Sequence, residues 1–482
     1  MGRTRINWLE RELGMRQNPM SNPAVISDFP ERPLVIEPGV SKRIFKRRVT
    51  PTVSLTTAIS IVVANMVGTG VFTSLGFQVA DLPSAFVIVC LWTLGGVVAL
   101  GGALSYAELA AALPRSGGEY HFLSRIFHPA LGFLAGWTSA TVGFAAPIAL
   151  AAMAFGTYAK GLMPGVSPLL LSLIVVWGTS AIHFTGQKRG SKFHNWFTGA
   201  KVVLMVAFIV AGFVTRATPG VSFLPARNDL HLMTGSSFAI ALVYVMYSYM
   251  GWNASTYIVN EIRDPKRNVP RSVFLGTLAV LVLYVALNAA FLRSTPLAAM
   301  SGQLEVGLIA GRQIFGAAGG QVVAALISLG LISAVSSMIW IGPRVTVAIG
   351  EDLPALSLLA IQTKNGTPRV ALGVQAVITT VLLLTGTFQG VLVYIQIALI
   401  LFSALTVLGV IVLRVREPGL ARPYKTWGYP VTPVLFLLVS GFMIFYLLKT
   451  QPTKSLEGLG TVILGLLFYF LAGGTPKKKE ET

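Results

Sequence analysis

Residues 54–77 read SLTTAISIVVANMVGTGVFTSLGF, a stretch of 24 residues without a charged side chain. A helix that crosses a bilayer needs about 20 mostly apolar residues, so this stretch predicts a membrane span. Gly68, Thr69 and Gly70 stand in its middle, where glycine weakens a helix. Lipid tolerates unwound backbone only against protein or a cavity, so a break in this helix would have to face one of the two.

Similar apolar stretches recur along the whole chain of 482 residues. Hydrophobic residues make up 54% of the chain and charged residues only 11%, whereas a typical soluble protein has about 25% charged residues. We interpret the chain as an all-α integral membrane protein with twelve transmembrane helices. The expected spans are 53–80, 83–112, 130–158, 168–186, 193–215, 236–260, 272–293, 320–347, 370–387, 390–413, 430–448 and 457–473.

The net charge of +19 has two explanations. In a soluble protein it would indicate nucleic acid binding, whereas in a membrane protein Lys and Arg collect in cytoplasmic loops. With the N-terminus inside and alternating sides, 29 of the 37 Lys and Arg residues lie on the cytoplasmic side and 7 outside. The sequence therefore predicts a multi-pass protein of the plasma membrane with both termini cytoplasmic and no nucleic acid partner. Residues 1–50 are expected to form a cytoplasmic tail rather than a signal peptide.

A second interruption lies in the span 236–260, where Gly251 precedes Trp252 and Asn253. Close packing of helices through small residues would explain one such site. Two broken spans that lie five spans apart indicate instead a five-plus-five inverted repeat, with a binding site between the broken helices.

Five groups of residues follow one another in an order that resembles one transporter family. They are Val67-Gly68-Thr69-Gly70-Val71-Phe72; Tyr106-Ala107-Glu108-Leu109 with Leu113-Pro114-Arg115-Ser116-Gly117-Gly118-Glu119-Tyr120; Tyr249-Met250-Gly251-Trp252-Asn253; Asn260-Glu261-Ile262-Arg263-Asp264-Pro265-Lys266-Arg267-Asn268-Val269-Pro270-Arg271; and Arg422-Pro423-Tyr424-Lys425-Thr426-Trp427-Gly428-Tyr429-Pro430. As a set, over about residues 50–473, they resemble the amino acid–polyamine–organocation (APC) superfamily. The resemblance implies the fold of the bacterial leucine transporter class and secondary active transport of amino acids.

The resemblance also implies the domain organisation and the partners. The first repeat is expected over residues 51–235 and the second over 236–415, with two peripheral spans and a basic tail over 416–482. The family's mammalian heteromeric branch uses a cysteine in the loop after span 3 to attach a heavy chain. Residues 160–168 contain no cysteine, and Cys90 lies in an apolar stretch, so no disulfide-linked heavy chain is expected.

An amino acid is a zwitterion, and a broken helix can bind both of its charges through backbone groups. The N–H groups of Thr69, Gly70 and Val71, at the start of a second half-helix, are expected to bind the carboxylate. The unpaired carbonyls of Met66 and Tyr249, at the ends of the first halves, are expected to accept the ammonium. Glycine in the broken segment would let the ligand approach the backbone closely.

Side chains of span 6 are expected to close this site. By the family pattern, Tyr247 is the gate outside the ligand, and Ser248 and Met250 line the site. Trp252 either faces the site or packs on a neighbouring helix, and Trp340 is a weaker candidate. The predicted substrate site consists of Met66, Gly68, Thr69, Gly70, Val71, Tyr247, Ser248, Tyr249, Met250, Gly251 and Trp252.

Lys201 is the one basic residue that the charge count leaves inside a span. Such a lysine costs about 2.5–3.5 kcal/mol to insert and is by default functional. Ser333, Ser336 and Ser337 lie at a matching depth on span 8, on the face that also carries Trp340. We predict that the ammonium bridges span 1 carbonyls and these hydroxyls, as a coupling site. The resemblance supports this role, because sodium-independent family members place a lysine where others hold a sodium ion.

The remaining ionisable residues are given structural roles. Glu108 and Glu119 are expected to pair with Arg115 or Arg125, and Glu261 with the basic residues that follow it. The histidines lack the spacing of metal ligands, so no metal, cofactor or catalytic group is expected.

Three other functions are weighed against transport of neutral amino acids. A polyamine or cationic amino acid transporter would need acidic residues at the pocket, and the predicted site has none, so neutral substrates are favoured. An intramembrane enzyme would need a cluster of a nucleophile, His or Asp at one depth, and no such cluster appears in the sequence. A non-transporting amino acid sensor stays open as an alternative.

Overall fold

The described part of the chain is built from helices. The computed structural model describes residues 51–163, 165–185, 187–363, 365–386 and 388–471. Within these ranges the one β contact is an isolated bridge between Val53 and Ile262. The expected N-terminal tail and the basic C-terminal tail lie outside the described residues. For the described residues, the prediction of an all-helical chain is confirmed.

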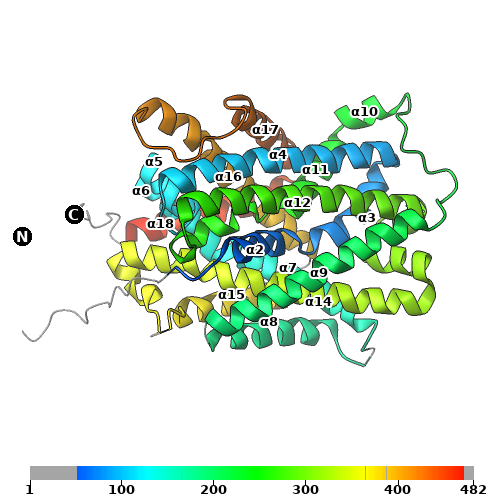
Figure 1. Cartoon of the computed structure of the whole chain (residues 1–482), viewed down its shortest axis with the longest axis horizontal. Helices are drawn as coiled ribbons and strands as arrows, with labels where there is room; N and C mark the ends of the chain where they lie inside the picture. The colour runs from blue at the N-terminus through cyan, green and yellow to red at the C-terminus, as the bar shows by residue number, and fades with distance from the viewer. Residues whose placement is uncertain (1–50, 164, 186, 364, 387, 472–482) are drawn as a thin grey trace, which may run out of the picture. The chain divides into compact units, whose positions relative to one another are not determined.

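The helices follow the predicted spans closely, with short helices added between them (Figure 1). They are α2 Leu55–Met66, α3 Gly70–Asp81, α4 Ala85–Ala112, α5 Glu119–Ile126, α6 Pro129–Thr138, the π-helix η2 Ser139–Gly143, α7 Ala145–Lys160, α8 Pro168–Phe184, α9 Gln187–Val214, α10 Asp229–Thr234, α11 Ser236–Tyr249, the 3-10 helix η3 Trp252–Glu261, α12 Pro265–Ser294, α13 Leu297–Met300, α14 Val306–Asp352, the 3-10 helix η4 Pro354–Ala360, α15 Arg369–Thr385, α16 Phe388–Arg416, α17 Val431–Thr450 and α18 Pro452–Leu471.

Eight helical stretches of the described residues are long and apolar enough to cross a membrane. They are Leu55–Asp81, Ala85–Ala112, Pro129–Lys160, Pro265–Ser294, Val306–Asp352, Gly390–Arg416, Val431–Thr450 and Pro452–Leu471. Three shorter apolar helices accompany them, Pro168–Phe184, Thr198–Val214 and Arg369–Thr385. The chain is therefore a multi-pass membrane protein.

Several helices begin where the sequence provides a capping residue. The side chains of Ser54, Ser84 and Ser167 accept the N–H groups of Thr57, Val87 and Leu170 at 3.2, 3.3 and 3.1 Å. A serine in this position satisfies one of the free N–H groups of the first turn. These caps start α2, α4 and α8 within two residues of the predicted span starts.

Two of the predicted spans differ from a simple helix. The third is divided by the π-helix η2 between α6 and α7. The eighth begins earlier than expected, because α14 runs over 47 residues from Val306, with a change of direction at Gly316. Gly316 has φ 76° and ψ −177°, which are not helical angles. The long connection of residues 294–319, between the seventh and eighth predicted spans, thus contains α13 and the first part of α14.

The helices on which the site depends pack against one another along their lengths. The helix α12 lies between α4 and α2, as Figure 1 shows for its side against α4. The helix α14 packs on α7 and on α9, and α11 packs on α3 and α4. The interruptions of α2–α3 and α11–η3 are therefore enclosed by long, regular helices.

Candidate functional site

A cavity of about 80 Å³ lies where the two interrupted segments meet. A cavity needs about 10–15 Å³ of such space to admit one water molecule, so this one has room for a small ligand. Its lining comes from α2, α3, α5, η2, α7, α11, η3, α14 and α16. The lining residues are Asn65, Met66, Gly68, Thr69, Gly70, Glu119, Ser139, Gly143, Phe144, Pro147, Tyr247, Ser248, Met250, Gly251, Asn253, Tyr257, Met338 and Leu399.

The first interruption places free N–H groups at one wall of the cavity. The helix α2 ends at Met66 and α3 begins at Gly70, and the N–H of Gly68 turns back to the Met66 carbonyl at 2.8 Å. Among the described residues, the N–H groups of Thr69, Gly70 and Val71 have no hydrogen-bond acceptor. The start of a helix also carries partial positive charge, so this wall is suited to an anion.

The second interruption lies directly against the first. The helix α11 ends at Tyr249, Met250 is extended, and Gly251 has φ 110° and ψ −4°. A Cβ on Gly251 would lie 2.8 and 2.9 Å from the carbonyl carbon and oxygen of Asn65. Both the left-handed backbone and the lack of space require glycine here.

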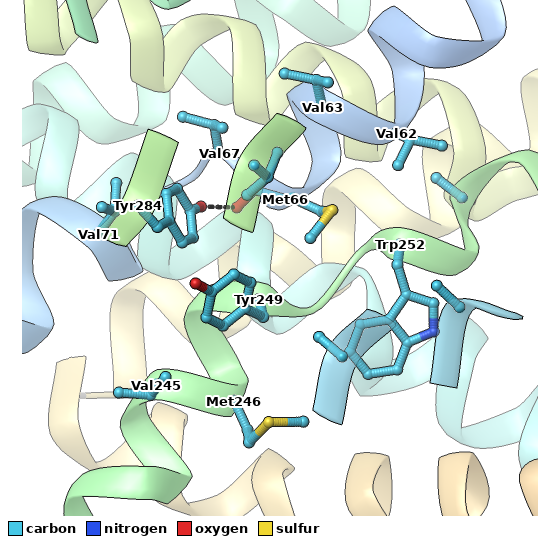
Figure 2. Close-up of a cluster of buried hydrophobic side chains, with 14 of the residues drawn as sticks. Val62, Val63, Met66, Val67, Val71, Val245, Met246, Tyr249, Trp252 and Tyr284 are labelled. Atoms are coloured by element: carbon cyan, nitrogen blue, oxygen red, sulfur yellow. Dashed lines mark hydrogen bonds between the residues drawn. The ribbon is translucent and has the colours of Figure 1, made fainter. Parts of the chain in front are cut away.

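The carbonyl group of Met66 is not the free acceptor that we expected. It already accepts hydrogen bonds from the Gly68 N–H at 2.8 Å and from the Tyr284 hydroxyl at 2.6 Å, the second of which is dashed in Figure 2. A carbonyl oxygen has two lone pairs, so these donors occupy both. The carbonyl of Asn65 has no donor among the described residues, and Asn65 lines the cavity. The free carbonyl acceptor on this wall is therefore that of Asn65, one residue before the expected Met66.

Tyr249 also takes a different position from the expected one. Its carbonyl has no donor in the part of the chain that the structure describes, but Tyr249 does not line the cavity. Its hydroxyl points to the neighbouring helix and donates to the Trp92 carbonyl at 3.0 Å.

Tyr247 and Ser248 line the cavity as predicted, and Ser248 also explains Gly70. The Ser248 hydroxyl donates to the Tyr244 carbonyl at 2.9 Å and lies 3.2 Å from the Ser74 hydroxyl. A Cβ on Gly70 would come within 2.7 Å of the Ser248 α-carbon. Gly70 therefore permits α3 to pack on α11, which is a different role from the ligand approach that we expected. A Cβ on Gly68 would meet no atom closer than 3.9 Å.

Val71 and Trp252 lie outside the cavity lining. Val71 is fully buried in the core. The Trp252 ring packs edge-on against Tyr106 and Phe436, at centroid distances of 6.4 and 6.0 Å. Of the two orientations considered for Trp252, the structure has the one against neighbouring helices, and Figure 2 shows the ring within a cluster of buried hydrophobic side chains. Trp340 likewise lies away from the cavity, 6.5 Å from the His183 ring.

Lys201 reaches the interruption of α2 from the helix α9. Its side chain is 2% exposed, and its Nζ donates to the carbonyls of Ala64, at 3.3 Å, and Val67. These two carbonyls lack their usual helical donors because the chain unwinds after Met66. The ammonium thus replaces hydrogen bonds that the break has removed.

The serines of α14 do not bind Lys201, contrary to our expectation. Ser333 lies 3.2 Å from the Thr198 hydroxyl, and Ser336 lies 2.9 Å from Nε2 of His183. The Ser337 hydroxyl has no partner among the described residues. Lys201 therefore contacts the carbonyls at the end of α2, as predicted, but not the serine hydroxyls of α14.

Several lining residues were not predicted. Ser139 and Gly143 belong to the π-helix η2, and Phe144 and Pro147 follow it at the start of α7. A π-helix adds a residue to a turn and is frequent at functional sites, but an apolar span contains no periodic signal that reveals it. Met338 and Leu399 were missed for a similar reason, because helices that are apolar on every side do not show which side faces inward.

The acidic residues have partners other than those expected. Glu108 pairs with Arg414 and Arg422, at 2.6 and 3.5 Å, and accepts the Thr426 N–H at 2.7 Å. Further ion pairs join Arg115 to Asp352 at 2.8 Å, Arg125 to Glu417 at 2.8 Å, and Glu261 to Arg344 at 2.9 Å. The pairs of Glu108, Arg115 and Arg125 lie where α4 ends and α5 begins, which we call the α5 end of the bundle.

Glu119 lines the cavity and pairs with no arginine in the described part of the chain. Its Oε1 accepts from the Tyr106 hydroxyl, from Ser403 at 3.3 Å and from Nδ2 of Asn253 at 3.4 Å. The prediction that the pocket contains no acidic residue is therefore wrong.

Comparison with known proteins gives consistent relatives over most of the chain. The family described as Amino acid permease matches residues 53–469. The b(0,+)-type amino acid transporter 1 of Mus musculus is 29% identical over 430 residues, which cover 87% of this chain and 87% of that protein. The Asc-type amino acid transporter 1 of Mus musculus is 26% identical, and the Large neutral amino acids transporter small subunit 2 of Oryctolagus cuniculus is 27% identical. For both, the match covers 87% of this chain and 80% of the relative.

Proposed function

The chain belongs to the amino acid permease family, and we propose that it is a sodium-independent secondary transporter of α-amino acids that works by alternating access. Its relatives are amino acid transporters, and the match covers 80–87% of their length. The chain is therefore a transporter and not an enzyme. The proposal is carried by one observation. The N–H groups of Thr69 and Gly70 and the carbonyl of Asn65 have no hydrogen-bond partner among the described residues, and all three residues line the same cavity.

This arrangement matches the two charges of an amino acid. The substrate carboxylate binds to the N–H groups of Thr69 and Gly70, where the dipole of α3 favours an anion. The α-ammonium binds to the free carbonyl oxygen of Asn65 on the opposite wall. The side chain extends toward Ser139, Phe144 and Met338, which line the remainder of the cavity. The lining has no lysine or arginine to bind an acidic side chain, and its one carboxyl, Glu119, already accepts three neutral donors, so neutral substrates are favoured.

The proposed architecture is twelve spans with both termini cytoplasmic in the plasma membrane. The α2–α3 and α11–η3 interruptions support an inverted repeat of residues 51–235 and 236–415, followed by two peripheral spans. The excess of Lys and Arg at the α5 end supports the orientation, since positive residues stay in the cytoplasm. The α5 end would then be the cytoplasmic end of the transport path.

Lys201 is the proposed coupling residue. A sodium ion in a broken-helix transporter is held by unwound carbonyls, and here the Lys201 ammonium contacts the carbonyls of Ala64 and Val67 instead. A resident cation of this kind removes the need for sodium. The cycle is then proton-coupled or an exchange of one amino acid for another.

The test is counterflow in proteoliposomes that contain the purified full-length protein. Liposomes loaded with an unlabelled mixture of alanine, leucine and lysine are diluted into each labelled amino acid, in sodium or in choline buffer. We expect accumulation of the neutral labels at equal rates in both buffers. Accumulation only in sodium would contradict the role of Lys201. Binding of an amino acid without any counterflow would indicate the sensor alternative, and preference for lysine or for labelled putrescine would indicate the cationic one.

A further inference from the structure

One ionisable group of the cavity has no role in the mechanism above. Apart from the phenols of Tyr247 and Tyr257, Glu119 is the only lining residue with an acidic or basic side chain. It is 4% exposed and begins α5 directly after Gly117 and Gly118, whose φ angles are 121° and 54°. A Cβ on Gly118 would lie 2.3 Å from the Tyr257 ring, so this turn presses the start of α5 against η3. The fold thus places the carboxyl at the cavity wall.

The neutral donors around Glu119 come from three different elements. Tyr106 belongs to α4, Asn253 to η3 and Ser403 to α16, and all three bond to Oε1. No donor to Oε2 is present in the described ranges. Because η3 follows the Gly251 break, the carboxyl connects the second half of a broken helix to two neighbouring helices and to α5.

The charged groups nearest to this cluster are occupied elsewhere. Arg115 and the Tyr120 hydroxyl bind Asp352, both at 2.8 Å, and Arg414 binds Glu108. Besides the Tyr106 phenol that donates to it, the titratable side chain that faces the carboxyl is Tyr257, whose hydroxyl accepts from Asn253 at 3.1 Å. No cation of the described chain neutralises Glu119, so its ionisation is costly in this buried position.

We propose that Glu119 is a proton-binding site of the transport cavity, which accepts a proton from water at the α5 end onto Oε2 and returns it there. The inference rests on the proposed transport function. A charged carboxylate holds its hydrogen-bond donors about twice as strongly as a neutral group. Ionised Glu119 therefore holds α4, η3 and α16 together, and protonation weakens these contacts so that η3 can move relative to α5. If Glu119 binds the proton more tightly in one arrangement of η3 relative to α5, protonation shifts the population toward that arrangement.

The surroundings of Glu119 bring the pKa of its carboxyl close to neutral pH. Burial raises the pKa of the carboxyl from 4.5 to about 7, while the hydrogen bonds from Tyr106, Ser403 and Asn253 act in the opposite direction. Removal of the Tyr106 hydroxyl should therefore raise this pKa further, because the charged form loses a donor.

The test is the pH dependence of counterflow with Glu119→Gln, which keeps the shape of a protonated carboxyl but cannot titrate. Proteoliposomes are prepared at a series of values between about pH 5 and pH 9, and initial rates are measured with labelled alanine, leucine and lysine. Glu417→Gln is the matched control, because Glu417 lies at the same end, outside the cavity lining, and pairs with Arg125. Tyr106→Phe is the second variant, which changes the pKa of Glu119 without removing its carboxyl.

We expect the wild-type rate with neutral labels to change about tenfold across the two pH units around the midpoint, as for one titrating group. The Glu417→Gln protein should keep this profile, Glu119→Gln should lose it, and Tyr106→Phe should shift the midpoint upward. An unchanged midpoint in both Glu119→Gln and Tyr106→Phe would overturn the proposal. So would a Glu119→Gln protein that loses only lysine transport and keeps the pH profile, which would identify a subsite for a cationic side chain. If Glu119→Gln does not fold, the Tyr106→Phe shift decides alone. A wild-type protein without counterflow of any label would instead contradict the proposed function.

Discussion

The α-carbon of Gly251 lies against the peptide group of Asn65, so closely that a Cβ on the glycine would come within 2.8 Å of the Asn65 carbonyl carbon. The two residues are far apart in the sequence, and each belongs to one of the interrupted segments. Their contact brings the unwound ends of α2 and α11 together at the cavity. Each interruption is thus held in place by the other.

Substitution of Gly251 by alanine should destabilise the protein and abolish substrate binding. A non-glycine residue with φ 110° is strained by about 1–3 kcal/mol, and the Cβ would also collide with the Asn65 backbone. The unfolding temperature of the purified protein in detergent measures the loss. Gly441→Ala is the control, because a Cβ there meets no atom within 4 Å. Equal unfolding temperatures for the two variants would show that the contact contributes nothing.

Gly68 and Gly70 should respond to alanine in different ways. The Gly68→Ala protein should keep its stability, because the new Cβ meets nothing closer than 3.9 Å, but should bind substrate about tenfold more weakly, since Gly68 lines the cavity. The Gly70→Ala protein should lose both, because its Cβ collides with the Ser248 backbone of α11. Unfolding temperature, with and without saturating amino acid, separates the two effects. A stable Gly70→Ala protein with normal affinity would contradict this distinction.

Removal of the Lys201 amine should reduce transport at least tenfold, an effect of about 1.4 kcal/mol or more. The Lys201→Met protein leaves the carbonyls of Ala64 and Val67 without a donor in a buried position, which is costly. Counterflow of labelled alanine in choline buffer measures the loss. The control is Lys454→Met, where the lysine is exposed and pairs with Glu457. Full activity of Lys201→Met in choline would exclude Lys201 as the resident cation.

The raised pKa of Glu119 should also be visible in stability. A carboxyl whose pKa is about 7 in the folded protein and 4.5 otherwise resists ionisation, so folding stability falls as pH rises between these values. The loss approaches about 3 kcal/mol above neutral pH. Glu119→Gln cannot titrate, so it should be more stable than wild type at pH 8 and similar at pH 4.5. Unfolding temperatures at the two pH values check the sign, and a difference independent of pH would contradict it.

The sequence by itself determined that this is a helical membrane protein, and it identified where two helices are interrupted. Hydropathy is a local property, since about 20 apolar residues can form a span whatever surrounds them. Glycines in a span and a lysine among apolar residues are equally local signals. Gly68, Gly251 and Lys201 could therefore be singled out without knowledge of the packing.

Only the tertiary structure decided which groups meet at the cavity. Trp252 directly follows the Gly251 break, where helical periodicity is lost, so the sequence does not show that its ring faces Tyr106 and Phe436 rather than the cavity. Tyr284, far along the chain, occupies the Met66 carbonyl and moves the free acceptor to Asn65. Glu119 lies near Arg115 and Arg125 in sequence, but those arginines bind Asp352 and Glu417 across the bundle. Partner choice among charged and polar groups depends on distances between helices, and the sequence order of the groups does not contain those distances.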